Sequence, residues 1–558
     1  MRGLNKYIGG LAVVLGLFSC VEENKLEVKP FKDVLNFDQE VSNLSGTLQK
    51  EVIQGDGIES KTLNSPNFQV EMKPFIDANF NRMANKENYI RTEEISVLSG
   101  WRDVVWRSKN DKLPVKSAIY RFDGDSCISA KLFVANESTV YNHTETLTYV
   151  KGSGYSIENE QLISGLKNEQ FYLSGQFESK PQPWRMFFDI GNNQKVPVNF
   201  DLISVDDKME LIFHQGKERI KMPVESTSNG YRVEIPIFQA YLTFTLANDL
   251  MVGEFHNLDK GDDYIIPFTA MKLPYEAVVN YNLDESYPDF SGKWETYFGE
   301  GDEKSAAIGL IDRLGNDLVG TFATETGDYR FLQGKVIGNS FSLSTFDGSH
   351  LFLFTGKING NEITEGHFYS GSHYHTVWSA KKNESFELLD PDKMTTLQEG
   401  VEKVDFTFPD LNGNSVSLGD AKFENKVVII QILGSWCPNC MDETRYFKEL
   451  YSKYNKDGLE IIGLAFERSN DFEVAKTSLN KAIKDLAVPY TMLIAGTPKE
   501  SASALPMITK IKSYPTSIIL DKKGNVVQIH TGFYGPSTGK YYEDYTHEME
   551  ILLEGLLR

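Results

Sequence analysis

The chain carries one close pair of cysteines, Cys437 and Cys440, within the stretch GSWCPNCMDET (residues 434–444). Two thiols three residues apart can exchange electrons with a disulfide in another molecule, through a mixed disulfide that the second thiol resolves. The same spacing can supply half of a zinc site, but a closed site needs four ligands. Neither a second C-x-x-C nor a C-x-x-H motif lies nearby. The pair therefore favours thiol–disulfide exchange over metal binding.

The segments on either side indicate which thiol should react. KVVIIQIL (426–433) is a continuous apolar run, typical of a buried central strand, and PNCMDETRYFKELYSKYN (438–455) has a helical pattern with one apolar face. Cys437 thus falls where a strand turns into a helix, and the free backbone N–H groups and the helix dipole there favour a thiolate. We expect Cys437 to be the nucleophile. Pro438 suits the first helical turn, and Cys440, on the same helix face, should resolve the mixed disulfide.

Strands and helices alternate along the rest of this region. LEIIGLAFE (459–467) indicates a second buried strand and EVAKTSLNKAIKDL (473–486) a second helix. TSIILDKKGNVVQIHTGF (516–533) predicts two strands joined by a KKGN turn, and YTHEMEILLEGLL (545–557) predicts a closing helix. This order predicts a mixed sheet with helices on both faces.

These features resemble a known family. WCPNC, the later SYPTSIILDKKG (513–524) and the element order resemble the thioredoxin fold. Within that fold the sequence is similar to the membrane-anchored TlpA/ResA-type thiol–disulfide oxidoreductases of the bacterial envelope, which are related to the AhpC/TSA proteins. The resemblance covers residues 403–558, and FTFPDLNGNSVSLGDAKFENK (406–426) fits the extra N-terminal hairpin of that family.

The resemblance also implies roles for residues around the cysteines. Apart from the resemblance, we expect Trp436 to shield the pair on one side and Asn439 to support the site. In the family, the proline that matches Pro515 is cis and packs against the disulfide. With Tyr514 it offers a backbone edge that pairs with an extended substrate. The alternative for Pro515 is an ordinary trans proline at the start of a strand.

Glu443 lies one helix turn beyond Cys440. In the ResA-type branch, a glutamate at this spacing sits beside the cysteines and tunes their protonation. Alternatively, Asp442 and Glu443 are solvated acids in the first turns of a helix, where acids are favoured. Gln431 stands where many thioredoxins carry a buried acid, which increases the interest of Glu443.

Two other functions remain open for this chain. Peroxiredoxins share the extended fold, but their P-x-x-x-T-x-x-C pattern is absent, because Ile430 and Gly434 occupy the proline and threonine positions. The pattern disfavours thiol peroxidase activity. A ligand- or partner-binding surface lipoprotein with an accessory redox domain is the alternative from another class.

The N-terminus predicts export and lipidation. Arg2 and Lys6 precede a short apolar core, LAVVLGLF (11–18), and the segment ends in LFSC at Cys20. This segment resembles a lipoprotein signal peptide (residues 1–20), with Cys20 lipidated and any membrane contact made through the lipid alone. The alternative is an ordinary signal peptide. We expect a location in the bacterial cell envelope, facing the periplasm or on the outer-membrane surface, where disulfides can persist.

Composition limits the remaining possibilities. The 558 residues exceed what one core can hold, and 12% aromatic content favours β-structure. A formal net charge of −21 without a concentrated basic segment makes nucleic acid an unfavourable partner. The lone Cys127 is expected to be a buried apolar residue.

The remaining sequence predicts three further units and a linker. Residues 21–160 suggest an α+β domain of unknown role, with helical spacing over 34–53. Residues 161–282 and 283–383 suggest duplicated antiparallel β meanders, since residues 229–270 and 338–380 share a pattern of short strands and turns. Residues 384–402 would link these units to the thioredoxin-like domain.

Four histidines fall in the second copy: His350, His367, His373 and His375. His373 and His375 would share one face of a strand. These histidines could form a metal or haem site, or they could be polar residues on exposed strands. We favour the second interpretation because no Cys or carboxylate stands at ligand spacing.

Together these features predict a multidomain, lipid-anchored oxidoreductase that acts on protein thiols or disulfides, most simply as a reductase. It would draw electrons from an envelope donor and would need no metal or cofactor besides the Cys437–Cys440 disulfide. The N-terminal units would hold the redox domain away from the membrane and select its clients.

Overall fold

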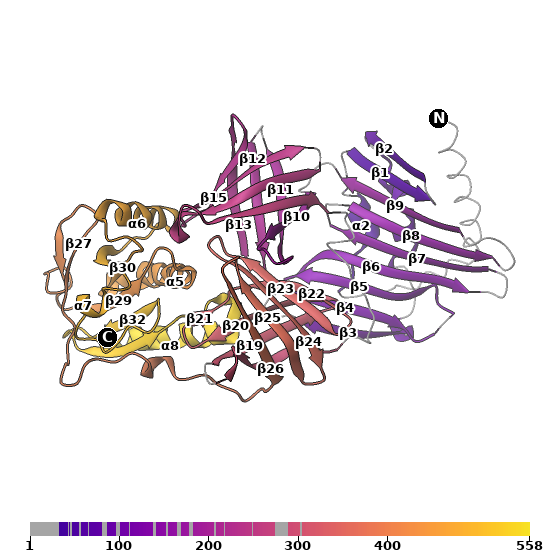
Figure 1. Cartoon of the computed structure of the whole chain (residues 1–558). Helices are drawn as coiled ribbons and strands as arrows, with labels where there is room; N and C mark the ends of the chain where they lie inside the picture. Colours follow the sequence, from indigo (N-terminus) through magenta and orange to yellow (C-terminus); the bar gives the residue numbers. More distant parts are fainter. Residues whose placement is uncertain are drawn as a thin grey trace.

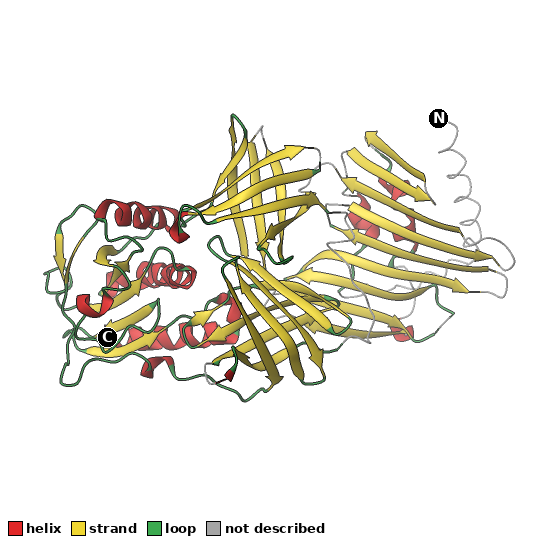
Figure 2. Ribbon diagram, viewed as in Figure 1, coloured by secondary structure: helices red, strands yellow, loops and turns green. Residues whose placement is uncertain are grey.

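In a computed structural model of the chain, the structure describes residues 33–558 apart from 43, 45–46, 55–56, 65, 81–85, 96–100, 111, 138–140, 152–153, 164–168, 178–181, 206–207, 217, 248, 274–287 and 302–303. Three β-rich units precede an α/β unit, which confirms the predicted multidomain fold class (Figure 1). The long helices belong to the α/β unit (Figure 2). We call these units the first domain (33–177), the barrel (182–272), the third domain (290–382) and the C-terminal domain (391–558).

The first domain is a nine-stranded antiparallel sheet in the order β2-β1-β9-β8-β7-β6-β5-β4-β3. Short helices pack on its core face, where Phe37 and Phe75 contact Tyr149 edge to face. Its elements are α2 (Phe37–Ser42), β1 (Thr47–Gln54), β2 (Gly57–Asn64), α3 (Phe68–Glu71), α4 (Lys73–Asp77), η3 (Lys86–Asn88), β3 (Tyr89–Ile95), β4 (Trp101–Ser108), β5 (Val115–Asp123), β6 (Ser126–Glu137), β7 (Tyr141–Val150), β8 (Gly154–Ile163) and β9 (Glu169–Phe177).

Two predictions for this region are wrong. The helical spacing over 34–53 yields a helix only at Phe37–Ser42, and β1 follows, because it pairs with β2 on one side and with the distant β9 on the other. The boundary predicted at residue 160 falls inside β8, because β8 and β9 complete the first sheet.

The barrel is a closed, antiparallel ring of eight strands whose first and last strands pair. It consists of β10 (Gln182–Asp189), β11 (Lys195–Val205), β12 (Lys208–Gln215), β13 (Glu218–Thr227), β14 (Gly230–Glu234), β15 (Ala240–Ala247), β16 (Leu250–Asn257), η4 (Leu258–Lys260) and β17 (Ile265–Lys272). Alternate side chains point inward, so Phe188, Phe213 and Phe255 fill the interior.

The third domain repeats this plan, because pairing of β19 with β20 closes its sheet as well. It consists of β18 (Gly292–Phe298), β19 (Ser305–Leu314), β20 (Asp317–Thr324), β21 (Gly327–Asp328), β22 (Leu332–Ile337), β23 (Ser340–Phe346), β24 (Leu351–Asn359), β25 (Glu362–Ser370) and β26 (Tyr374–Lys382). The two sequence copies, 229–270 and 338–380, correspond to β14–β17 and β23–β26, the last four strands of each meander.

The C-terminal domain has a five-stranded sheet in the order β31-β30-β29-β32-β33. Its elements are η7 (Pro391–Lys393), β27 (Thr407–Pro409), β28 (Ser415–Ser417), β29 (Val427–Leu433), α5 (Pro438–Tyr454), η8 (Asn455–Asp457), β30 (Leu459–Phe466), α6 (Phe472–Leu486), β31 (Thr491–Gly496), α7 (Ser501–Ala504), β32 (Thr516–Leu520), β33 (Val526–Thr531), η9 (Pro536–Thr538) and α8 (Lys540–Leu557). The predicted strands, helices and N-terminal hairpin are present, whereas β31 and α7 were not predicted.

The two faces of this sheet differ. Strands β29, β30 and β31 are parallel, and each lies beside the previous one in the same direction across the sheet. Because both crossover connections are right-handed, α5 and α6 lie on the same face of the sheet. The core of that face also takes in Met549 and Leu553 of α8. The other face is covered by the β27–β28 hairpin and by Leu505 and Ile508, next to the short α7.

The predicted linker is part of this domain. Leu397 forms a bridge with Ile508, and Asp392 accepts hydrogen bonds from Gln528 and pairs with His530. Only residues 383–390 lie between the last strand of the third domain and the first element of the C-terminal domain.

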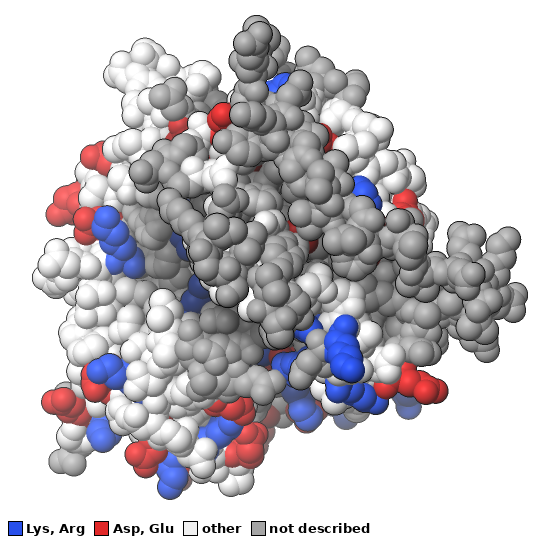
Figure 3. All heavy atoms as spheres, turned by 90° about the vertical axis from the view of Figure 1, so that its right-hand side faces the viewer, with Lys and Arg blue, Asp and Glu red and all other residues white. Residues whose placement is uncertain are grey.

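Within the described residues, no helix is long and apolar enough to cross a membrane. Figure 3 views the end of the molecule formed by the first domain, where acidic and basic side chains alternate over the described surface.

Candidate functional site

The two cysteines lie at the start of α5, directly after the central strand β29. Cys437 is the N-cap residue of α5, and its Sγ accepts a hydrogen bond of 3.3 Å from the backbone N–H of Cys440. Both are free thiols. A sulfur that accepts a backbone N–H at a helix N-terminus is placed to carry negative charge. Cys440 is 0% exposed and Cys437 only 6%, so Cys437 is the more accessible sulfur in this arrangement.

The loop before β32 forms the opposite wall of the site. The Tyr514–Pro515 peptide bond is cis, as the resemblance implied. The thiol of Cys437 donates a hydrogen bond of 3.4 Å to the backbone oxygen of Tyr514. The ring of Tyr514 meets that of Trp436 edge to face at 5.6 Å. The predicted residues Trp436, Cys437, Tyr514 and Pro515 are therefore brought together.

Trp436 is fixed by contacts on two sides. Its Nε1 donates a hydrogen bond of 2.9 Å to the backbone oxygen of Phe466 at the end of β30. The guanidinium of Arg468 lies over its ring, 3.9 Å from the centroid. Such a cation–π contact holds the indole in place beside the cysteine pair.

Glu443 is a buried residue of the site rather than a solvated acid. It is 0% exposed, and burial raises its pKa to about 8 from the ordinary 4.5. The neighbouring Asp442 is also buried, and burial raises its pKa to about 6 even though the charge of Arg330 opposes the shift. A carboxyl group with a pKa near ambient pH suits proton transfer.

Gln431 connects the central strand β29 to Glu443 and Cys440 on the cysteine helix, a role that sequence reasoning did not find. Its Nε2 donates hydrogen bonds to Glu443 Oε2 at 2.9 Å and to the Cys440 backbone oxygen at 3.3 Å. Its Oε1 accepts from the hydroxyls of Thr444 and Tyr490. A buried amide with these partners holds the Glu443 carboxyl in one orientation.

The pKa of Cys440 is raised well above its ordinary value. Burial is the largest cause, followed by the hydrogen bond and charge of Cys437, and the charge of Glu443 adds to the shift. Cys440 therefore needs a nearby base before it can act as a thiolate. Glu443 is the buried carboxyl group of α5 whose charge acts on this thiol.

A second buried acid supports the loop before the motif. Glu467 accepts hydrogen bonds from the backbone N–H of Ser435 at 3.0 Å and from its hydroxyl at 2.7 Å. Burial raises the pKa of Glu467 to about 7. The only sequence signal was its place directly after a buried strand, and its partner Ser435 is 32 positions away.

Asn439, predicted to support the site, points away from the C-terminal domain core. Its Nδ2 donates a hydrogen bond of 3.2 Å to the backbone oxygen of Asp328, a residue of the third domain. The cysteine motif is thus in direct contact with another domain, which the sequence did not predict.

The remaining predicted residues lie elsewhere. Cys20 is outside the described residues. Cys127 is buried in the first domain, its thiol donates to the Ser129 backbone oxygen, and burial raises its pKa to about 12. His367 Nδ1 lies 3.1 Å from His375 Nε2. In the described part of the chain, no three metal-ligating side chains gather at one place.

The site can be compared with known proteins. A family model described as Redoxin matches residues 398–543. The thiol-disulfide oxidoreductase ResA of Bacillus thuringiensis subsp. konkukian (strain 97-27) is 31% identical over 153 residues, which are 27% of this chain and 79% of that protein. The thioredoxin-like protein YneN of Bacillus subtilis (strain 168) is 29% identical over 140 residues, 25% of this chain and 75% of that protein.

Among solved structures, a thiol:disulfide interchange protein of the thioredoxin family from Chlorobium tepidum TLS is 18% identical. It matches with a TM-score of 0.23 over 29% of this chain and 100% of its own length. The C-terminal domain is a thioredoxin-like thiol–disulfide oxidoreductase. Through this domain, the chain belongs to the ResA family of thiol–disulfide oxidoreductases.

Proposed function

We propose that the chain is a lipid-anchored envelope protein that reduces disulfides in other polypeptides with the Cys437–Cys440 pair. The observation that carries this proposal is the hydrogen bond of 3.3 Å from the Cys440 backbone N–H to Cys437 Sγ at the first turn of α5. It places a backbone N–H donor on the sulfur of the cysteine that is less deeply buried, the one a client can reach first.

The exchange takes place in two steps. The Cys437 thiolate attacks one sulfur of a client disulfide, which forms a mixed disulfide and releases the first client thiolate. Cys440 then loses its proton and attacks Cys437 Sγ, which forms the 437–440 disulfide and releases the second client thiolate. Two electrons pass from the pair to the client, and both client sulfurs take up protons. A thiol donor of the envelope then reduces the 437–440 disulfide.

Glu443 handles the proton in the second step. Cys440 is completely buried, so its proton needs an acceptor inside the domain. The pKa of Glu443 is about 8, so a fraction of its carboxyl groups is ionised near neutral pH and can accept that proton. Gln431 keeps the carboxyl in position through its 2.9 Å hydrogen bond.

The proposed location rests on the N-terminal sequence. The apolar core at 11–18 and the LFSC ending at Cys20 support lipidation, and no segment besides this one suggests membrane contact. In an oxidising compartment, a reductase needs a supply of electrons, so the proposal includes an envelope donor.

The proposal is tested with the full chain, dithiothreitol as the electron source and insulin as the disulfide client. We expect the chain to accelerate reduction of the insulin disulfides, and Cys437→Ser to abolish the acceleration. Cys127→Ser, at a buried cysteine of the first domain, serves as the matched control and should retain it. Equal rates for the chain and for its Cys437→Ser variant would overturn the proposal.

A further inference from the structure

The segment Thr324–Arg330 of the third domain reaches across to the cysteine motif. It leaves β20, turns through Thr326 and returns as the short β21. Figure 1 shows β20 and β21 beside α8, with α5 close to them. We call this segment the covering turn.

The covering turn contacts three separate segments of the C-terminal domain: the first turn of α5 and two loops. At the cysteine motif, Asn439 Nδ2 donates to the Asp328 backbone oxygen at 3.2 Å. At the cis-proline loop, Ser513 Oγ donates to the Thr326 backbone oxygen at 2.9 Å. At the loop after β33, the backbone N–H of Gly535 donates to Asp328 Oδ2 at 2.6 Å.

The carboxylate of Asp328 is buried against the C-terminal domain. It is 9% exposed, and its second oxygen accepts hydrogen bonds from the Ser537 hydroxyl at 2.8 Å and from the Arg330 backbone N–H at 2.6 Å. Each of the two carboxylate oxygens of Asp328 thus accepts a hydrogen bond from the C-terminal domain, one from Gly535 and one from Ser537.

Glycines stand on both sides of the contact at the tip of the turn. Gly327 has φ +147°, and a Cβ there would lie 1.9 Å from Asn439 Nδ2. Gly532 has φ +85°, and a Cβ there would lie 2.9 Å from the Thr326 carbonyl carbon. At Gly532 the two backbones approach as closely as glycine allows, whereas a Cβ at Gly327 would force the Asn439 side chain away from its hydrogen bond to Asp328.

A cluster of charged side chains, Arg330 with Glu218 and Asp442, also holds the covering turn in place. Arg330 pairs through Nη2 with both carboxylate oxygens of Glu218 on the barrel, at 2.8 and 2.7 Å. Its Nη1 lies 3.2 Å from Asp442 Oδ2 on α5, two residues after Cys440. One side chain thus connects the third domain, the barrel and the cysteine helix.

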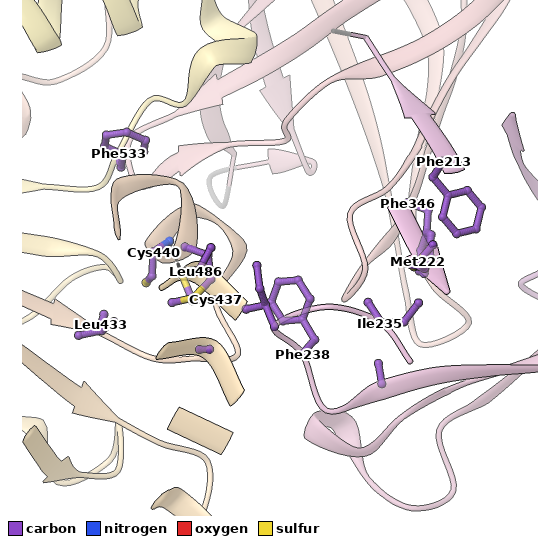
Figure 4. Packing of buried hydrophobic residues seen from close by; sticks show 14 of the residues in the cluster. Phe213, Met222, Ile235, Phe238, Phe346, Leu433, Cys437, Cys440, Leu486 and Phe533 are labelled. Carbon is purple, nitrogen blue, oxygen red and sulfur yellow. Dashed lines mark hydrogen bonds between the residues drawn. The ribbon is translucent and has the colours of Figure 1, made fainter. Parts of the chain in front are cut away.

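The barrel closes the site from a second direction. The loop between β14 and β15 docks on α6, where the Ile237 backbone N–H donates to Asp485 at 2.8 Å and Lys481 donates to the Phe238 backbone oxygen. Phe238 belongs to the same buried cluster as Cys437 and Leu486 and lies beside them in Figure 4.

We propose that the covering turn occupies the surface on which clients bind, so that a client must displace it before Cys437 can attack. This inference rests on the proposed function. The turn is bonded to the side chains of Asn439, two residues after Cys437, and of Ser513, directly before Tyr514–Pro515. It therefore lies next to the cis-proline loop, the edge with which an extended client would pair. Cys437 is only 6% exposed while the turn is bonded to Asn439, two residues further along the chain, and we expect this exposure to increase when that contact opens.

The test measures access to Cys437 without any client. The fully reduced, full-length chain is treated with iodoacetamide, and modification of the Cys437 peptide is followed by mass spectrometry. Gly327→Ala should accelerate this modification at least several-fold, because the new Cβ displaces the Asn439 amide from its hydrogen bond to Asp328 and strains the backbone at φ +147°. Gly338→Ala is the matched control, because Gly338 also has a positive φ of +62° in the third domain but nothing lies within 4 Å of its Cβ position.

A second variant removes the anchor instead of adding a clash. Asp328→Ala deletes the acceptor of Gly535 and Ser537 and should also accelerate modification of Cys437. Circular dichroism and thermal melting establish that each variant is folded. If both folded variants are modified at the wild-type rate, the covering turn does not restrict access and the proposal is overturned.

The two proposals fail in different ways. Alkylation needs only an accessible thiol, whereas insulin reduction needs a complete exchange cycle. If alkylation becomes faster but neither the wild type nor any variant reduces insulin, the reductase function is contradicted, whereas the proposal for the covering turn still holds. If insulin is reduced but alkylation is unchanged in both variants, the reductase function holds and the proposal for the covering turn is contradicted.

Discussion

The side-chain amide of Gln431 donates a hydrogen bond of 2.9 Å to the carboxyl group of Glu443, and both residues are completely buried. This bond links the central strand to the helix that carries the cysteines. It also places a proton-accepting group whose pKa is about 8 beside a thiol whose pKa is raised by burial. Proton transfer at this pair should control the second step of exchange.

Replacing Glu443 should alter the pH dependence of exchange. In the wild-type chain, the rate of insulin reduction should rise with an inflection near pH 8, as the Glu443 carboxyl loses its proton and becomes a base for Cys440. Glu443→Gln should lack this inflection and be slower above pH 8, in rates measured from pH 6 to 9. Glu473→Gln, on the exposed face of α6, is the control. Superimposable profiles for Glu443→Gln and the wild type would remove Glu443 from the mechanism.

Stability should depend on pH through the same carboxyl group. Its pKa is raised from 4.5 to about 8 in the folded chain, so the folded state keeps a proton that the unfolded state releases above pH 4.5. This contribution to stability is fully present below pH 4.5 and is lost as pH rises to about 8, a change on the order of 3–5 kcal/mol. Glu443→Gln should flatten the fall in melting temperature over that interval. An equally steep fall in the variant would contradict the assignment.

Removing the side-chain amide of Gln431 should raise the pKa of Glu443 further. Gln431→Leu deletes the hydrogen bond that stabilises the carboxylate, so the pKa of Glu443 should rise above about 8 and the inflection in the rate profile should move to higher pH. The hydroxyls of Thr444 and Tyr490 lose their acceptor, at a cost of about 1–3 kcal/mol. Gln528→Leu, at an exposed pair with Asp392, should change neither quantity. An unmoved inflection would show that Gln431 does not act on Glu443.

The ion cluster behind the covering turn should be important for stability. Arg330→Met removes the bidentate partner of the half-buried Glu218 and leaves the buried Asp442 with Arg445 alone, which should lower the free energy of unfolding by about 3–5 kcal/mol. Arg232→Met breaks an exposed pair with Glu234 and should cost no more than about 1 kcal/mol. Denaturant titration of the C-terminal domain signal in the full chain gives both values. Equal effects of the two substitutions would contradict the role assigned to Arg330.

The sequence was informative where the signal is local. The apolar run at 426–433, the following helix and the WCPNC motif are consecutive, so periodicity and spacing define the strand, the helix and the cysteine pair. The meanders were also found, because the pattern of 229–270 is repeated at 338–380.

The sequence was uninformative where partners are far apart. The strand β1 depends on pairing with β9, more than a hundred residues away, and no local window shows this. The short strand β31 has only six residues and no alternation. The contact between Asp328 and Asn439 depends on how two domains dock, and neither residue stands out in its own segment.

The proposed function depends on Cys437 and Cys440 forming a reversible two-electron couple. The direct measurement is a redox titration of the full chain against dithiothreitol buffers, with the 437–440 disulfide quantified by mass spectrometry. We predict one two-electron transition located on these two cysteines, at a reducing potential near the thioredoxin value of about −270 mV. A pair that stays as two thiols throughout the titration, or a couple near the strongly oxidising value of about −120 mV, would contradict it.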